Sequence, residues 1–82
     1  MIDDDTMDRL CARIDAADKR YGPFASSHEA LGVITEEYHE LIDAIRYNHK
    51  FDTMFEALDV AAACIRLAGC LDNKATAERS VK

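Results

Sequence analysis

The sequence contains too few cysteines for a fold held together by disulfides. Its 82 residues include three, Cys11, Cys64 and Cys70, which is an odd number with no CxxC pair. Each falls in a stretch with helical spacing, where a small buried thiol is the ordinary interpretation. The cysteine content therefore indicates a protein of a reducing compartment rather than a secreted one.

Long apolar runs are also missing. A membrane-spanning helix needs about 18 or more apolar residues in succession, and no stretch of the chain approaches that length. The N-terminal sequence MIDDDTMD is acidic and lacks the apolar core of a signal peptide. We therefore expect a cytoplasmic protein with no membrane partner.

Positive charge is in the minority. Lys and Arg together number 10 and Asp and Glu together number 16, which gives a net charge of −6. Proteins that bind DNA or RNA polymers need a basic surface, so we expect no such partner. A small phosphate ligand is still compatible with this sequence, because a divalent cation can lie between carboxylates and phosphates.

Helical periodicity is what the sequence has in abundance. Apolar residues recur every three or four positions, and 49% hydrophobic with 32% charged residues is the composition of one globular domain, residues 1–82. The spacing predicts a first helix over about 4–20, ended by Gly22 and Pro23. Ser26 and Glu29 have capping-box spacing and start a second helix.

The later helices follow the same periodicity. The second helix fades around YNHK, and its apolar stripe consists of Leu31, Ile34, Tyr38, Leu41, Ile42 and Ile45. A third helix starts near Asp52, and its predicted buried stripe consists of Phe55, Leu58, Ala61, Ala62, Ile65 and Ala68. Asp72 or Asn73 is the expected N-cap of a short fourth helix that ends near Arg79.

The connections between these helices are short, which favours antiparallel neighbours. We therefore predict an all-α fold, an antiparallel helical bundle of three long helices plus a short C-terminal helix. The apolar surface is generous for a single chain of this size. We expect dimerisation to complete the bundle, in a homodimer or a homotetramer built from two dimers.

Carboxylates are concentrated at two places on these helices. The second helix carries E-E-x-x-E and the third carries E-x-x-D, formed by Glu36, Glu37, Glu40, Glu56 and Asp59. Residues three and four apart share a helix face, and like charges at these spacings cost about 0.2–0.5 kcal/mol per pair. If the two helices are antiparallel neighbours, four carboxylates from the two motifs converge.

Asp59 strengthens the case for a metal site. It lies between Leu58 and Val60 in the helix that we expect to be the most enclosed, and Arg66, seven residues further on, is too distant to neutralise it. A buried carboxylate without a partner is costly, and a hard divalent cation is a natural partner for several carboxylate oxygens. The competing interpretation is an ordinary solvated acidic face.

The order of these acids resembles the signature of the MazG-type all-α nucleoside triphosphate pyrophosphohydrolases. RYGPFASSHEALGVITEEYHELIDAI resembles the end of that family's first helix and its metal-bearing second helix, and EALDVAAACIRLAGCLDN resembles its third helix and following turn. The related phosphoribosyl-ATP pyrophosphatases follow the aspartate with a Tyr-His pair. This chain has VAAA there, which favours the nucleoside triphosphate branch.

The resemblance implies Mg²⁺-dependent hydrolysis, with Mn²⁺ as an alternative metal, of a nucleoside triphosphate to monophosphate and pyrophosphate. It implies a set of four metal ligands, Glu37, Glu40, Glu56 and Asp59. The implied catalytic residues are Glu36 and Glu37, with Glu36 either a further ligand or the group that orients the attacking water. Candidate phosphate contacts, each also interpretable as a plain surface cation, are Arg46, Lys50, Lys74 and Arg79.

Two other functions fit the same residues. Glu36 and His39 form Glu-x-x-His, the spacing found in di-iron carboxylate bundles. A homodimer would supply two such motifs, with Glu56 of each chain completing the ligand set, and this hypothesis makes His39 essential and Asp59 dispensable. The second alternative is a non-enzymatic helical interaction module whose acids bind no metal.

Overall fold

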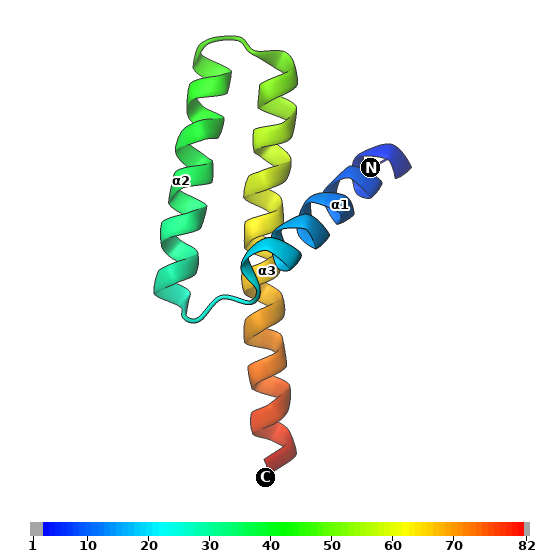
Figure 1. Cartoon of the computed structure of the whole chain (residues 1–82), viewed down its shortest axis with the longest axis vertical. Coiled ribbons are helices and arrows are strands. Elements are labelled where there is room, and N and C mark those ends of the chain that lie inside the picture. The colour runs from blue at the N-terminus through cyan, green and yellow to red at the C-terminus, as the bar shows by residue number, and fades with distance from the viewer. Residues whose placement is uncertain (1–2, 82) are drawn as a thin grey trace.

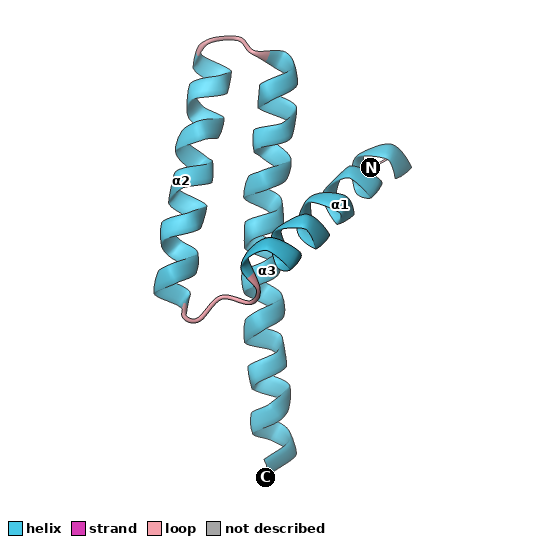
Figure 2. Ribbon diagram, viewed as in Figure 1, coloured by secondary structure: helices cyan, strands magenta, loops and turns pink. Residues whose placement is uncertain are grey.

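Three helices make up the part of the chain that the computed structural model describes, which is the backbone of residues 3–81 and the side chains of residues 3–72. They are α1 (Asp4–Tyr21), α2 (Ser27–Arg46) and α3 (Lys50–Val81), and no strand occurs among the described residues. Figures 1 and 2 show α2 and α3 as an antiparallel hairpin, with α1 lying across α3 and projecting away from that hairpin. The predicted all-α fold is confirmed.

The chain reverses direction between α2 and α3 at the C-terminal cap of α2. Asn48 adopts a left-handed conformation with φ 59°, which asparagine tolerates better than most residues. The His49 amide donates to the Ala44 carbonyl at 3.0 Å and the Asn48 amide donates to the Ile45 carbonyl at 3.2 Å, the pair of bonds that defines a Schellman motif. This turn sends α3 back along α2.

The start of α2 is as the sequence predicts. The Ser26 hydroxyl accepts from the Glu29 amide at 3.1 Å, and the Glu29 carboxylate accepts from the Ala25 amide at 3.3 Å. The first bond satisfies an amide that a helix start leaves unpaired, and the second holds the residue that precedes the N-cap. The α2 register, and with it the position of its carboxylates, is therefore fixed locally.

Buried Arg66 on α3 anchors the α1–α2 connection. Its Nε donates to Asp18 Oδ1 at 2.8 Å, and its Nη2 donates to the Gly22 carbonyl at 2.6 Å. Its guanidinium also lies over the Phe24 ring, 4.5 Å from the centroid. Because these partners sit at the end of α1 and in the following loop, one side chain positions both helices against α3.

Two details of α3 correct the prediction. There is no separate C-terminal helix, because α3 runs unbroken through Asp72 and Asn73 for 32 residues. No Gly or Pro follows Gly69, and Lys, Ala, Glu and Arg favour continuation of the helix.

The predicted buried stripe of α3 is also partly wrong. Leu58 and Ala62 are buried as predicted, and Ala63 and Arg66 are buried as well. Three residues of the predicted stripe are exposed instead: Phe55, Ile65 and Ala68.

The buried residues of α3 differ from the predicted ones because α3 packs against two helices, α1 and α2, on different sides. Its sequence is apolar on several faces, so the periodicity alone does not show which face is buried. Two thiols expected to be buried are exposed: Cys11 lies on α1, which has no buried residue, and Cys64 lies on α3. No helix of the described chain has the length and apolarity needed to cross a membrane.

The single chain is unusually open for its mass. Its accessible surface is 6390 Å², whereas a folded monomer of 9.2 kDa exposes about 4,900 Å². Its radius of gyration is 14.5 Å, against about 12 Å for a compact domain of this length. The predicted apolar stripe of α2 is covered only in part: Ile34, Leu41 and Ile42 are half-buried. Leu31, Tyr38 and Ile45 are 62%, 54% and 56% exposed.

We expect Arg66→Leu to destabilise the chain by about 2–4 kcal/mol, because two hydrogen bonds of a charged donor and a cation–π contact are lost together. Asp18 is exposed enough to regain water, which limits the loss. Urea denaturation followed by circular dichroism measures it. Arg9→Leu, on exposed α1, is the matched control and should change stability by less than about 0.5 kcal/mol. A similarly small change for Arg66→Leu would show that other contacts hold the connection.

Candidate metal centre

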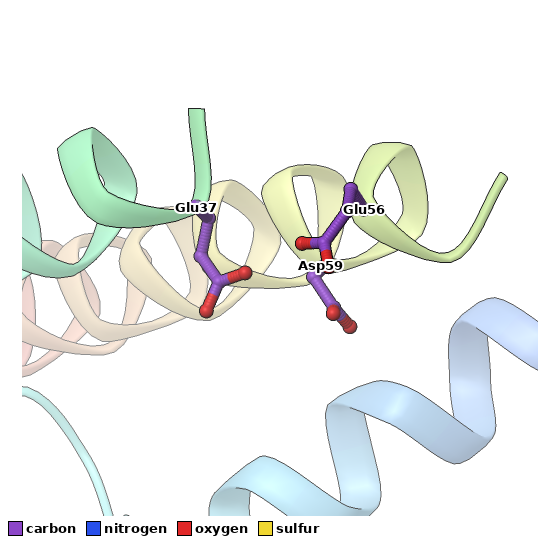
Figure 3. A group of neighbouring side chains, drawn as sticks. All are labelled: Glu37, Glu56 and Asp59. Carbon is purple, nitrogen blue, oxygen red and sulfur yellow. The ribbon is translucent and has the colours of Figure 1, made fainter. Parts of the chain in front are cut away.

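Three of the predicted acidic ligands meet where α2 faces α3. Glu37 comes from α2, and Glu56 and Asp59 come from one face of α3, as Figure 3 shows. One carboxylate oxygen from each residue lies within 4.8 Å of the others. We call these three residues the carboxylate trio. Within residues 3–72 it is the one group of His, Cys, Asp or Glu side chains close enough together to hold a metal ion.

The trio contains acceptors that the protein itself does not satisfy. Glu37 Oε2 and Glu56 Oε2 are both buried and have no hydrogen-bond partner. A buried acceptor left unpaired costs about 1–3 kcal/mol, and more when it carries charge. These oxygens are therefore free to accept from a proton donor or to bind a cation, and hard carboxylate oxygens are the ligands that Mg²⁺ and Mn²⁺ prefer.

The protonation of the trio reflects the same crowding. The pKa of Glu56 is raised to about 7, mainly because the carboxyl group is desolvated. The hydrogen bond and negative charge of Glu40 add to this effect, and so do the charges of Asp59 and Glu37. Desolvation is also the main cause that raises the pKa of Glu37, with smaller contributions from Glu40 and Asp59. Near neutral pH the cluster consequently retains a proton that a divalent cation would displace.

The other predicted acids lie around the trio rather than in it. Glu40 is exposed, but it approaches Glu37 and Glu56 closely enough to raise the pKa of both. Glu36 is exposed and lines the groove beside the trio. His39 is exposed and its ring lies 6.4 Å from that of Tyr38.

Asp59 has a cationic partner that the sequence analysis did not anticipate. Arg13 Nε lies 2.8 Å from Asp59 Oδ1, and Arg13 Nη2 donates to Asp59 Oδ2 at 3.2 Å. The expectation that Asp59 lacks a side-chain cation is therefore wrong, because the cation comes from another helix. One signal was available: Arg13 is three residues from Leu10 and four from Ala17, on the apolar side of the first predicted helix.

A groove of about 640 Å³ opens beside the trio between the three helices. Its wall includes acids, three arginines and two aromatic rings, among them Glu36, Glu37, Asp59, Arg13, Arg20, Arg66, Tyr21 and Phe24. That volume lies within the range of about 300–1,000 Å³ typical of small-ligand sites. The groove can thus present carboxylates and guanidinium groups to the same ligand.

The predicted phosphate contacts are not the cations of this groove. Lys50 and Arg46 are exposed near the α2–α3 turn and do not line it. The side chains of Lys74 and Arg79 lie outside the described residues. Arg13 and Arg20 were missed because both lie on the first helix, whereas the resemblance draws attention to cations after the third.

Comparison with protein-family models, curated proteins and solved structures found no match for the chain. The resemblance of its acidic motifs to the MazG-type enzymes therefore stays a prediction.

In metal-free buffer we expect the melting temperature to fall by several degrees between pH 5 and pH 8. A carboxyl whose pKa is about 7 when folded and about 4.3 when unfolded binds more protons in the folded state between those values. Its stabilising effect is complete below about pH 4.3 and is lost as the pH rises through about 7. The raised pKa of Glu37 acts in the same direction.

Glu56→Gln provides the internal comparison for this pH dependence. The neutral amide removes the titrating group, so the variant should melt higher than wild type at pH 8 and show a flatter profile. Differential scanning fluorimetry with EDTA present measures both proteins. A wild-type profile that is already flat from pH 5 to pH 8 would contradict the raised pKa.

Proposed function

We propose that this protein is a Mg²⁺- or Mn²⁺-dependent nucleoside triphosphate pyrophosphohydrolase that releases a nucleoside monophosphate and pyrophosphate. The observation that carries the proposal is the convergence of Glu37, Glu56 and Asp59, with two buried carboxylate oxygens that lack partners, at the edge of a ligand-sized groove. The order of the acidic motifs, which resembles that of the MazG-type enzymes, supports the same reaction.

The residues present fit a divalent cation. Glu37, Glu56 and Asp59 would hold it, with Glu40 adjacent as the fourth predicted ligand. Mg²⁺ accepts a few carboxylates and leaves its other positions to water and substrate phosphate oxygens, which suits a site open to a groove. When bound, such an ion supplies charge to polarise a phosphoryl group and lowers the pKa of coordinated water.

The protein's own contribution to the chemistry is proton transfer and orientation. Hydrolysis adds water across the bond between the α and β phosphates, and the water must lose a proton as it attacks. We assign to Glu36, which lines the groove wall, the role of orienting that water and accepting the proton. Neighbouring Glu37, which also lines the groove, is the second carboxylate that we assign to this role.

A product assay tests the proposal. Purified protein is incubated with ribo- and deoxynucleoside triphosphates plus Mg²⁺ or Mn²⁺, and monophosphate and pyrophosphate are resolved from diphosphate and phosphate. We expect monophosphate and pyrophosphate, abolished by Asp59→Asn and reduced about 10²- to 10⁴-fold by Glu36→Gln. Asp43→Asn, an exposed acid on the same helix, is the matched control and should retain activity.

The same variants separate the alternatives. Loss of function in His39→Gln with an active Asp59→Asn would favour the di-iron arrangement instead. Millimolar Mg²⁺ should also raise the wild-type melting temperature, because a ligand at about 100 times its Kd stabilises the folded state by about 2.7 kcal/mol. No turnover together with an unchanged melting temperature would leave a helical interaction module.

We further propose that a second copy of the chain covers the open face of α2. Leu31, Tyr38 and Ile45 recur every seven residues on this face, a spacing that suits helix–helix packing. All three side chains are more than half exposed in the single chain, so a second copy packed here would remove apolar surface from water.

We expect sedimentation equilibrium to show a dimer or tetramer for the wild type and a monomer for Tyr38→Lys, which places a charge at the centre of the stripe. Lys19→Ala, at an exposed position of α1, is the control and should keep the wild-type mass. A monomeric wild type at micromolar concentration would refute the proposed assembly.

A further inference from the structure

Arg13 brings a positive charge from α1 directly against the carboxylate trio. Figure 3 shows the Asp59 side chain directed towards the α1 ribbon rather than towards Glu37. Both Asp59 oxygens have a guanidinium nitrogen at 2.8 or 3.2 Å. In this arrangement Arg13 already neutralises the carboxylate that the proposed metal would need.

The ion pair between Arg13 and Asp59 is partly exposed to solvent and can be exchanged for another partner. Only the Nη2 contact is an aligned hydrogen bond, because Nε lies close to Oδ1 yet has no acceptor along its N–H direction. The two side chains are 38% and 29% exposed, so water can take the place of either partner. A partly solvated ion pair of this kind is worth little net free energy and is readily exchanged.

The rest of Arg13 is positioned to remain nearby after such an exchange. Its guanidinium lies 4.9 Å from the centroid of the Phe55 ring, and the side chain forms part of the groove wall. A guanidinium held over an aromatic ring keeps its charge and its donors. Released from Asp59, it would face the groove where the proposed function places the phosphates.

We propose that Arg13 and a divalent cation compete for Asp59, so that metal binding frees the Arg13 guanidinium for a phosphate group in the groove. The inference rests on the proposed function, since it concerns the same metal. Two cations sharing one aspartate would repel each other, and the Arg13 guanidinium already lies against both Asp59 oxygens, at 2.8 and 3.2 Å. Arg13 is thus a positioning residue that links α1 to the metal centre.

The link has a structural consequence for α1. No residue of α1 is buried, and Asp18 ties its C-terminal end to Arg66. Towards the N-terminus its polar contacts with α3 are those of Arg13 and a 3.9 Å contact from Arg9 to the Met54 sulfur. Exchange of Arg13 for a metal therefore loosens the N-terminal half of α1 and leaves the anchored end in place. By reciprocity, a firmly docked α1 weakens metal binding.

Titration with Mn²⁺, followed by electron paramagnetic resonance of the free ion at pH 7.5, tests the competition without relying on catalysis. Arg13→Gln should bind Mn²⁺ about 5-fold tighter than wild type or more, because Asp59 is no longer occupied. Arg20→Gln removes the same charge from the same helix and groove, but its guanidinium lies over the Tyr21 ring. This control measures the general electrostatic effect and should change affinity by less than about 2-fold.

A second variant tests whether the charge of Arg13 or its two-nitrogen contact matters, and hydrogen exchange tests the effect on α1. Arg13→Lys keeps the charge but not the two-nitrogen contact, and it should bind Mn²⁺ with an affinity between those of wild type and Arg13→Gln. Hydrogen exchange of the amides of residues 8–14 should become faster in wild type when Mn²⁺ is added. In Arg13→Gln it should already be fast and independent of metal.

The outcomes distinguish the inference from the function on which it rests. Equal or weaker Mn²⁺ binding by Arg13→Gln, with tight binding by wild type, would overturn the competition and leave the metal centre standing. A gain in Arg20→Gln as large as that in Arg13→Gln would also overturn it. Absence of Mn²⁺ binding by every variant would overturn the metal centre, and the competition with it.

Discussion

Buried Arg66 is the contact on which the arrangement of the three helices depends. It satisfies Asp18 at the end of α1 and the Gly22 carbonyl in the following loop, and it covers Phe24. A charged group is buried at acceptable cost only when its donors are used and its surroundings are polarisable. Because α1 ends at this anchored connection and α2 follows it, the guanidinium helps to set where Arg13 meets α3 and where Glu37 faces Glu56.

The carboxylate trio destabilises the folded chain, whereas Arg66 stabilises it. Two buried oxygens without partners and a glutamate pKa raised to about 7 mean that the apo protein carries unfavourable charge at neutral pH. An 82-residue domain has only about 4–12 kcal/mol of stability in total. The cluster therefore lowers the stability of the folded chain at neutral pH, and the cation that we propose would offset that cost.

The sizes of the side chains on α2 determine which of its faces packs against α3. Three large apolar side chains of α2, those of Leu31, Tyr38 and Ile45, are exposed, whereas the buried residues of this helix are the small Ala30 and Ala44. Small residues let two helices approach closely, and that approach is what brings carboxylates from α2 and α3 within reach of one ion. The bulkier stripe is left for a partner of the kind that we propose.

The sequence by itself determined the features that depend on near neighbours. The capping pair Ser26 and Glu29 and the E-E-x-x-E and E-x-x-D spacings predicted where α2 begins and which acids share a face, because caps and helical periodicity act within a few residues. Only the tertiary structure decided that Arg13 pairs with Asp59, that Arg66 is buried and that Glu40 stays at the margin of the trio. Those outcomes depend on how α1 crosses α3, a long-range geometry that a periodic pattern along one helix does not encode.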